Sequence, residues 1–222
     1  MKISTNTLRI IAGKWRSRKL TFPDAEGLRP TADRVRETLF NWLQNHIAQE
    51  SCLDLFAGSG ACGIEALSRD ASHVTFIDNS AAALAAIRSN LQILGAINNN
   101  FTLHRQDALS WLDSVSLDSA AGSARDSAPG SAKGQQYGIA FVDPPFAANL
   151  LESACQKLED SQVLKPQALI YVESGTGLAR VKLPKNWLVL KSKQAGAVSF
   201  CLCQRRPEGV GRIEHDADGS IE

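Results

Sequence analysis

The chain has 222 residues, of which 44% are hydrophobic and 21% charged, with a formal net charge of +1. These values are typical of globular proteins and exclude a fibrous or disordered chain, and a fold of this size buries about 70% of the open chain's surface. No apolar run approaches the ~18 residues of a membrane span. The first ten residues also lack the apolar core of a secretion signal, so we expect a cytoplasmic protein without a membrane segment.

The cysteines and histidines indicate no special chemistry. Five cysteines are an odd number, and they lack the paired spacing of metal sites, which predicts buried, reduced thiols. The four histidines show no ligand spacing either. We therefore predict no metal site.

The N-terminal region is strongly basic. The first twenty residues contain six Lys or Arg and no acidic residue, although the whole chain is nearly neutral. This asymmetry favours a surface that meets a polyanion, and the alternative is a solvated basic tail. Trp15 lies in the cluster and would either stack on a base or pack against the domain. The candidate residues for contacting the polyanion are Arg9, Lys14, Trp15, Arg16, Arg18, Lys19, Arg29, Arg34 and Arg36.

The rest of the chain alternates between helical and strand-like patterns. An amphipathic helix is expected over residues 32–47, capped by Thr31. Strands are expected at 52–56, 74–77, 101–103, 139–142 and 169–172, and helices at 61–68, 81–94 and 150–158. This alternation predicts an α/β fold with a parallel sheet covered on both faces. Residues 188–191 and 198–203 are too close for a parallel crossover and predict an antiparallel hairpin at the end of the sheet.

Two segments fall outside this scheme. Residues 116–136 are rich in Ser, Ala and Gly and predict a flexible surface loop, and residues 207–222 predict a frayed tail. The expected organisation is a basic arm and helix over 1–48, followed by an α/β domain over 49–206.

A glycine-rich turn joins the first strand of this sheet to a helix. Gly58, Gly60 and Gly63 satisfy G-x-G-x-x-G, and Asp78 ends the next strand twenty residues after Gly58. This is the spacing of the dinucleotide fingerprint, in which the second acid binds a ribose hydroxyl. The pattern predicts a ligand that contains adenosine. A tight turn without a ligand is the alternative.

Asp54 precedes the turn and favours one such ligand. A carboxylate here would repel a pyrophosphate but attract the cationic groups of S-adenosylmethionine, whose own carboxylate suits the helix N-terminus. Asp54 could instead cap neighbouring amides, and Asp107 could either meet the adenine amino group or cap the helix after it. The expected cofactor contacts are Asp54, Phe56, Ala57, Gly58, Gly60, Asp78, Asn79, Asp107 and Ala108.

The sequence Asp-Pro-Pro-Phe follows the fourth strand, at residues 143–146. Two prolines fix the backbone and remove two N–H donors, so the local carbonyls can accept hydrogen bonds without competing amides. Asp143 adds an acceptor, and Phe146 adds a flat face on which a base could stack. We expect Asp143, Pro144 and Phe146 to hold an exocyclic amine for methylation. A proline-stiffened loop with a capping aspartate is the alternative.

These motifs together resemble known methyltransferases. The Asp-Leu-Phe-Ala-Gly-Ser-Gly run at 54–60 and the Asp-Pro-Pro-Phe run resemble class I S-adenosylmethionine methyltransferases that act on exocyclic amines. More closely, RIIAGKWR at 9–16, LRPT at 28–31 and DRVRETLFN at 33–41 resemble the bacterial ribosomal small-subunit methyltransferase D family. The likeness extends over roughly residues 9–205. The loop at 116–136 is longer than the family's link.

The resemblance implies a Rossmann-like, seven-stranded, mostly parallel sheet with a C-terminal antiparallel hairpin. It also implies S-adenosylmethionine as cofactor and methylation of guanine N2 in 16S ribosomal RNA, at guanine 966. The partner would be the small ribosomal subunit, bound by a monomer. The basic residues would then contact RNA phosphates, and the target guanine would leave its stack to reach Phe146.

Three rival interpretations remain at this point. The Asp-Pro-Pro-aromatic corner also serves adenine-N6 and glutamine-amide methyltransferases. The glycine spacing permits a nicotinamide oxidoreductase, which Asp54 disfavours. A non-catalytic ribosome-assembly protein could keep the same fold.

Overall fold

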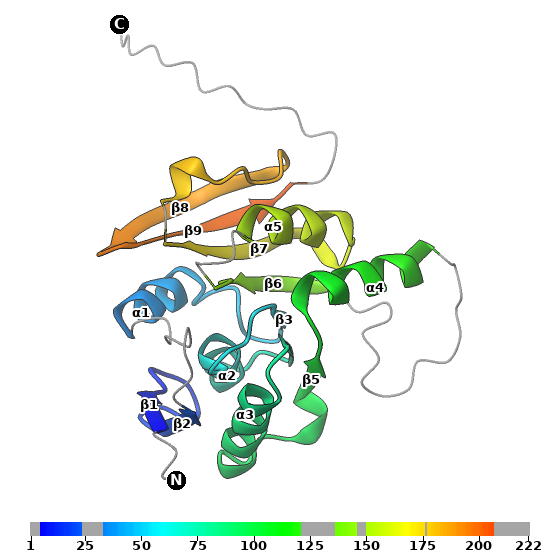
Figure 1. Ribbon diagram of the computed structural model, residues 1–222. Coiled ribbons are helices and arrows are strands. Elements are labelled where there is room, and N and C mark those ends of the chain that lie inside the picture. The colour runs from blue at the N-terminus through cyan, green and yellow to red at the C-terminus, as the bar shows by residue number, and fades with distance from the viewer. Residues whose placement is uncertain (1–4, 24–32, 121–135, 146–149, 176, 207–222) are drawn as a thin grey trace, which may run out of the picture.

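The computed structural model describes residues 5–23, 33–120, 136–145, 150–175 and 177–206. Its centre is a seven-stranded sheet in the order β5-β4-β3-β6-β7-β9-β8 (Figure 1). The strands are β3 (Ser51–Asp54), β4 (His73–Asp78), β5 (Phe101–Arg105), β6 (Tyr137–Val142), β7 (Leu164–Ser174), β8 (Trp187–Ala195) and β9 (Val198–Arg205). β3 to β7 pair in parallel, and β9 pairs antiparallel with both β7 and β8. The predicted parallel sheet with a terminal antiparallel hairpin is confirmed.

Helices cover both faces of the sheet (Figure 1). On one face lie α1 (Asp33–Trp42), α2 (Ala61–Ser68) and α3 (Ala81–Ile93), which share an apolar cluster with Phe141 and Tyr171 of the sheet. On the other face lie α4 (Ala108–Ala120) and α5 (Leu151–Asp160), which pack against Val142 and Val172. Successive strand residues point to opposite faces, so each central strand supplies both clusters. Two short 3-10 helices, η1 (Asn98–Asn100) and η3 (Leu178–Arg180), complete the described elements.

Several predicted boundaries are wrong, and the strand expected at 169–172, for example, is β7 over Leu164–Ser174. The helix expected over 32–47 ends at Trp42, because the chain then tightens into a turn in which the His46 amide donates to the Leu43 carbonyl at 2.8 Å. Leu43 and Ile47 are buried all the same, as their helical spacing suggested. The capping residue Thr31 lies outside the described residues.

The loop expected from residue 116 begins later, because α4 continues to Ala120. Serines are weak helix formers, but Ser114 and Ser116 donate their hydroxyls to the carbonyls of Trp111 and Leu112 one turn earlier. These bonds satisfy the serine hydroxyls inside the helix. The remainder of the predicted loop, 121–135, and the tail at 207–222 lie outside the described residues.

The N-terminal region is a folded hairpin, which the sequence analysis did not predict. β1 (Thr5–Arg9) pairs antiparallel with β2 (Lys19–Pro23), and Leu8, Leu20 and Phe22 belong to the same apolar cluster as α1, α2 and α3. The residues before and after position 48 share one apolar core. The expected division into a basic arm and an α/β domain therefore stays a prediction about function.

The hairpin is attached to two helices through hydrogen bonds. The Thr21 amide donates to the Asn90 side chain on α3 at 3.1 Å, and Asn90 donates back to the Thr21 carbonyl at 2.9 Å. The amides of Ile11 and Ala12 donate to the two carboxylate oxygens of Glu65 on α2, at 2.8 and 3.0 Å. Glu65 is fully buried, so these amides and Arg69, whose Nε lies 2.8 Å from Oε1, compensate its charge.

The five cysteines are all buried and form no disulfide, which confirms that expectation. Within the described residues, no helix combines the length and apolar character that a bilayer crossing requires. In the same residues, no three His, Cys, Asp or Glu side chains gather closely enough to hold a metal ion.

Candidate active site

The glycine-rich turn connects β3 to α2 at the carboxyl edge of the sheet. Gly58 and Gly60 both have left-handed backbones, with φ of +52° and +75°. A Cβ at Gly60 would lie 2.7 Å from the Ile87 side chain, so the chain packs too tightly there for any other residue. A Cβ at Gly58 would instead find its nearest atom 3.9 Å away, at the Phe56 carbonyl. The turn is therefore closed on the helix side and open at Gly58, where a ligand can approach the backbone.

Asp54 ends β3 and lies beneath this turn. Its side chain is only 4% exposed and accepts a hydrogen bond from the Gly63 amide of α2 at 2.9 Å. Burial, opposed by the Gly63 amide and helped by the charge of Asp78, raises the pKa of Asp54 from 3.8 to about 7. Asp54 thus caps an amide, which was the alternative role, while its charge lies where a cation would be stabilised.

Asp78 ends β4, the neighbouring strand, and accepts two backbone amides. Gly58 donates to one carboxylate oxygen and Ser80 to the other, each at 2.7 Å. Asp78 therefore fixes the glycine turn against β4. Each oxygen still has a lone pair for a further donor.

Asp107 follows β5 and caps α4. It accepts the Ser110 amide at 2.9 Å and the Ser110 hydroxyl at 3.1 Å, and its side chain is exposed. The capping alternative is therefore observed, and a contact with adenine stays a prediction.

All nine predicted cofactor residues end or follow three adjacent parallel strands. Because parallel strands end at one edge of the sheet, the residues after β3, β4 and β5 lie along the same edge. The partly buried Phe56 and the buried Ala57 lie in the turn, Asn79 is exposed, and the buried Ala108 begins α4. The arrangement gives a row of backbone and carboxylate groups with no cationic side chain among them.

The diproline corner begins where β6 ends, next to β3. Asp54 pairs in register with Phe141 on the adjacent strand. Asp143 comes two residues after Phe141 and therefore lies just beyond the level of Asp54. Asp143 is partly exposed, Pro144 is buried and Pro145 is exposed. The structure therefore places the corner beside the glycine turn. Phe146 lies outside the described residues, so its role stays a prediction.

Glu173 is a site residue that the sequence analysis missed. It lies near the end of β7, is 5% exposed, and accepts a hydrogen bond from the Tyr171 hydroxyl at 2.6 Å. The signal was available, because Glu173 is an acid that ends an apolar strand, as Asp54 does.

Cys62 of α2 is a buried thiol whose pKa responds to the acids of this edge. Burial raises the pKa of the Cys62 thiol, and the negative charges of Asp54, Asp143 and Glu173 raise it further, against the positive charge of Arg36.

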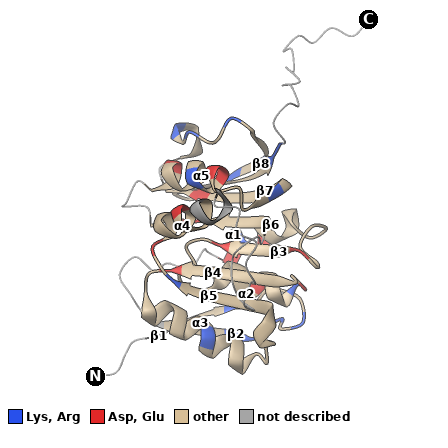
Figure 2. Cartoon of the chain, turned by 90° about the vertical axis from the view of Figure 1, so that its right-hand side faces the viewer, with Lys and Arg blue, Asp and Glu red and all other residues tan. Residues whose placement is uncertain are grey.

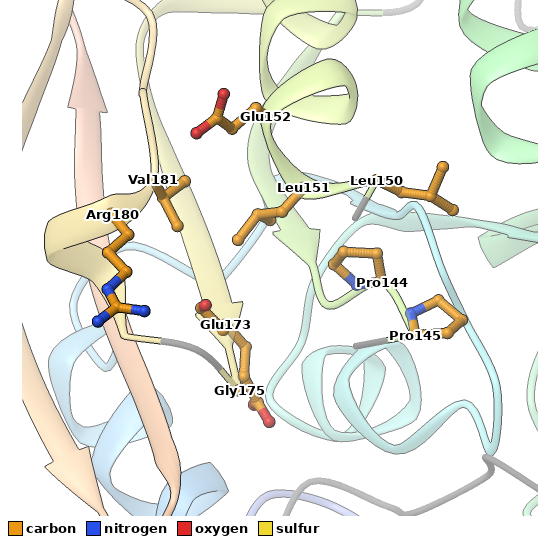
Figure 3. Close-up of a pocket in the computed structure, with 10 residues that line it drawn as sticks. Pro144, Pro145, Leu150, Leu151, Glu152, Glu173, Gly175, Arg180 and Val181 are labelled. Carbon is orange, nitrogen blue, oxygen red and sulfur yellow. The ribbon is translucent and has the colours of Figure 1, made fainter. Parts of the chain in front are cut away.

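A cavity of about 320 Å³ opens between the diproline corner and the end of β7 (Figure 3). Pro144 and Pro145 form one side, Glu173 and Arg180 lie across from them, and Leu151 of α5 contributes an apolar surface. Its volume is within the range of small-molecule sites. A second cavity of about 400 Å³ lies between α1 and the β8–β9 hairpin. Glu173 lines both.

The predicted basic contacts separate into exposed and buried residues. Arg9, Lys14, Arg16, Arg18, Lys19 and Arg34 are exposed. Of these, Arg18 donates to the Ile93 carbonyl at the end of α3 at 3.2 Å, and Lys14 lies 3.8 Å from Asp70. Arg29 lies outside the described residues.

Two of the predicted contacts are corrected by the structure. Trp15 is 9% exposed and belongs to the core, so it packs against the domain instead of offering its ring to a base. Arg36 is fully buried, and its Nη2 donates to the Arg9 carbonyl at 2.9 Å and to Asp33 at 2.6 Å. Arg36 therefore ties α1 to the hairpin and is not available to a phosphate.

Basic charge also occurs away from the hairpin. Figure 2 shows blue segments beside β2 and α3 and again near β8, at the opposite end of the sheet. Lys193 of β8 lines the second cavity together with Arg34 of α1. Lys193 was not among the predicted contacts, because an isolated lysine in a strand carries no distinguishing pattern.

The strand order, the glycine turn after β3 and the acids at the ends of β4 and β6 define a fold of the class I S-adenosylmethionine-dependent methyltransferases. The family described as Conserved hypothetical protein 95 matches residues 8–204. The chain belongs to the ribosomal RNA small subunit methyltransferase D family, as its motifs suggested.

Individual relatives support this membership over nearly the whole length. Ribosomal RNA small subunit methyltransferase D of Escherichia coli K12 is 44% identical, over 95% of this chain and 94% of its own. The protein of the same name from Haemophilus influenzae is 42% identical, over 89% and 93%. The solved structure of the putative methyltransferase yhhF from Escherichia coli has a TM-score of 0.75 and 42% identity, over 90% of this chain and 99% of that chain.

Proposed function

We propose that the protein transfers a methyl group from S-adenosylmethionine to the exocyclic N2 of a guanine in 16S ribosomal RNA. By the family resemblance this is guanine 966. The observation that carries the proposal is the adjacency of two sites on neighbouring strands. The glycine turn after β3 and the diproline corner after β6 lie side by side, because Asp54 and Phe141 are paired in register. Methyl transfer requires the donor and the amine acceptor to be adjacent, and these two neighbouring sites would bring them together.

The residues of the glycine turn fit the cofactor. The backbone is open at Gly58, the carboxylate of Asp78 can accept from hydroxyl groups, and Asp54 offers negative charge close to the N-terminus of α2. An ammonium or sulfonium would be stabilised by Asp54, and a carboxylate by the helix N-terminus. When bound, S-adenosylmethionine supplies an electrophilic methyl group on a positively charged sulfur.

The diproline corner would activate the acceptor through hydrogen bonds and then accept its proton. The lone pair of guanine N2 is conjugated with the ring, which makes N2 a weak nucleophile. The Asp143 carboxylate and the carbonyls of the corner accept from the N2 hydrogens and stabilise the positive charge that N2 develops as it gains the methyl group. Asp143 then accepts the proton that N2 loses. No covalent intermediate on the protein is required.

The exposed basic residues would bind the RNA backbone. Six cationic side chains on the hairpin, its connection and α1 are exposed, and phosphate contacts give affinity without sequence preference. We propose that the partner is the small ribosomal subunit and that the protein acts on it as a monomer in the cytoplasm.

The test is transfer of a radiolabelled methyl group to small subunits that lack this modification, followed by nucleoside analysis. We expect N2-methylguanosine with the native protein. Asp143→Ala should abolish transfer and keep the cofactor affinity measured by calorimetry, and the exposed Asp113→Asn on α4 should behave as the native protein. Methylated adenosine, no transfer by the native protein, or full activity in Asp143→Ala would contradict the proposal.

A further inference from the structure

Glu173 is a buried carboxylate that the proposed mechanism does not use. It is 5% exposed, and its carboxylate is oriented by the hydroxyl of Tyr171, which donates at 2.6 Å. The two side chains point to the same face of the sheet because they are two residues apart on β7. Burying a carboxylate costs free energy unless hydrogen-bond donors replace the water that it loses, so a buried carboxylate needs such donors.

The register of the sheet brings Glu173 to the acceptor site. Val142 of β6 pairs with Val172 of β7, so the next residues, Asp143 and Glu173, lie at the same level on adjacent strands. Figure 3 shows Glu173 across the cavity from Pro144. A base held at the diproline corner would therefore present an edge to Glu173.

The chemistry of a carboxylate selects which edge it can bind. An ionised carboxylate only accepts hydrogen bonds, and its two oxygens match two parallel donors. Guanine presents such a pair, N1–H and one N2–H, on its Watson–Crick edge. Adenine instead presents the unprotonated N1, whose lone pair a carboxylate would repel.

We propose that Glu173 recognises the N1–H and N2–H edge of the target guanine and makes the enzyme specific for that base. This inference rests on the proposed function. Each of the two carboxylates, Glu173 and Asp143, would then accept one hydrogen of the amino group. Glu173 accepts the N2 hydrogen next to N1, and Asp143, together with the carbonyls of the diproline corner, accepts the other. Both hydrogens are held, which fixes the base plane and leaves the N2 lone pair perpendicular to it.

The environment of Glu173 is consistent with this role. Burial raises the pKa of its carboxyl, because the ionised form has lost water that normally solvates it. Two donors from a guanine edge would replace that water and stabilise the ionised form. The same donors are absent from an adenine edge, so binding the wrong base would leave the carboxylate less well solvated.

The test compares guanine with 2-aminopurine at the target position of reconstituted small subunits. 2-Aminopurine keeps the 2-amino group, but its N1 is an acceptor and C6 carries no oxygen. We expect the native protein to prefer guanine. Glu173→Gln can still accept from the amino group, and its own amide can donate to the N1 of 2-aminopurine. We therefore expect kcat/KM for guanine to fall about 10- to 100-fold, and the preference to shift toward 2-aminopurine.

Three controls make the result decisive. Cofactor affinity and thermal unfolding should be nearly unchanged in Glu173→Gln, because the glutamine oxygen can still accept from Tyr171. Glu173→Asp keeps an acceptor, so it should retain the preference for guanine at a lower rate. Tyr171→Phe removes the orienting hydroxyl and should lower the rate without changing the preference.

A parallel fall for both bases in Glu173→Gln, with the preference unchanged, would overturn the specificity role and leave the proposed function intact. Failure of the native protein to methylate guanine N2 would overturn the proposed function and this inference together.

Discussion

The backbone at Gly13 lies directly against the carbonyl oxygen of Ser68, where α2 ends. A Cβ at Gly13 would be 1.8 Å from that oxygen, and Gly13 has a left-handed φ of +82°. The neighbouring Lys14 amide donates to the same oxygen at 2.8 Å. The contact therefore admits no side chain at all.

We predict that Gly13→Ala lowers the free energy of unfolding by at least about 2 kcal/mol, because backbone must move to relieve the overlap. Gly196→Ala is the matched control. Gly196 also has a positive φ, of +63°, but its Cβ would meet nothing within 4 Å. It should lose only about 1 kcal/mol, the cost of a left-handed backbone. Equal losses in urea unfolding would show that the Ser68 contact is unimportant.

Asp54 should make stability depend on pH. Since burial raises its pKa from 3.8 to about 7, the folded protein keeps a proton that the unfolded chain has lost. The free energy of unfolding therefore falls as pH rises from about 4 to about 7, by on the order of 4 kcal/mol at most. Asp54→Asn should abolish this contribution and be more stable than the native protein above pH 7.

The same variant should bind the cofactor poorly, because it has lost the charge that stabilises a cation. Unfolding curves at several pH values, with and without S-adenosylmethionine, would measure both effects. The exposed Asp113→Asn should follow the native pH profile. If the difference in free energy of unfolding between native protein and Asp54→Asn is the same at pH 5 and pH 8, burial does not raise the pKa of Asp54.

Arg36 and Arg34 lie on the same helix, but substitution of Arg36 should lower the stability, whereas substitution of Arg34 should weaken RNA binding. Arg36 is fully buried, with hydrogen bonds to Arg9 and Asp33, so Arg36→Met should cost about 1–3 kcal/mol of stability. Arg34 is exposed, so Arg34→Met should change stability by no more than about 0.5 kcal/mol and instead weaken RNA binding. Thermal unfolding and filter binding distinguish the two, and a stable Arg36→Met variant would refute the structural role.

Arg16 and Lys19 should contribute to affinity for RNA through phosphates. Both are exposed in the hairpin region. The double variant Arg16→Ala, Lys19→Ala should reduce the slope of log K against log salt by about 0.7–0.9 for each phosphate that is no longer neutralised. Lys157→Ala removes one positive charge from α5, on the opposite face of the sheet, and serves as control. An unchanged slope in the double variant would exclude phosphate contacts at these residues.

Much of the sheet and its site follows from local patterns in the sequence. Asp54 and Asp143 each end a short apolar run, and such runs in alternation with helices place their ends at one edge of a parallel sheet. The same rule applied to the run before Glu173 would have found that residue as well.

The N-terminal hairpin could not be predicted in this way. Leu8 and Leu20 belong to short strands that are held by helices far along the chain, so no local periodicity marks them. The basic residues around them suggested an RNA-binding arm, and that signal concealed the burial of Trp15 and Arg36. Which charges are exposed depends on long-range packing against α2 and α3.

The attachment of the hairpin to α2 and α3 has a consequence for synthesis. β1 and β2 are translated before α3, but their apolar side chains belong to a cluster that is complete only after α3, which ends at Ile93, has been made. Until then Leu8, Leu20 and Phe22 stay open to water, and a nascent chain that pauses before residue 93 would be prone to aggregate. The hairpin must therefore wait for segments that are translated after it before it can fold.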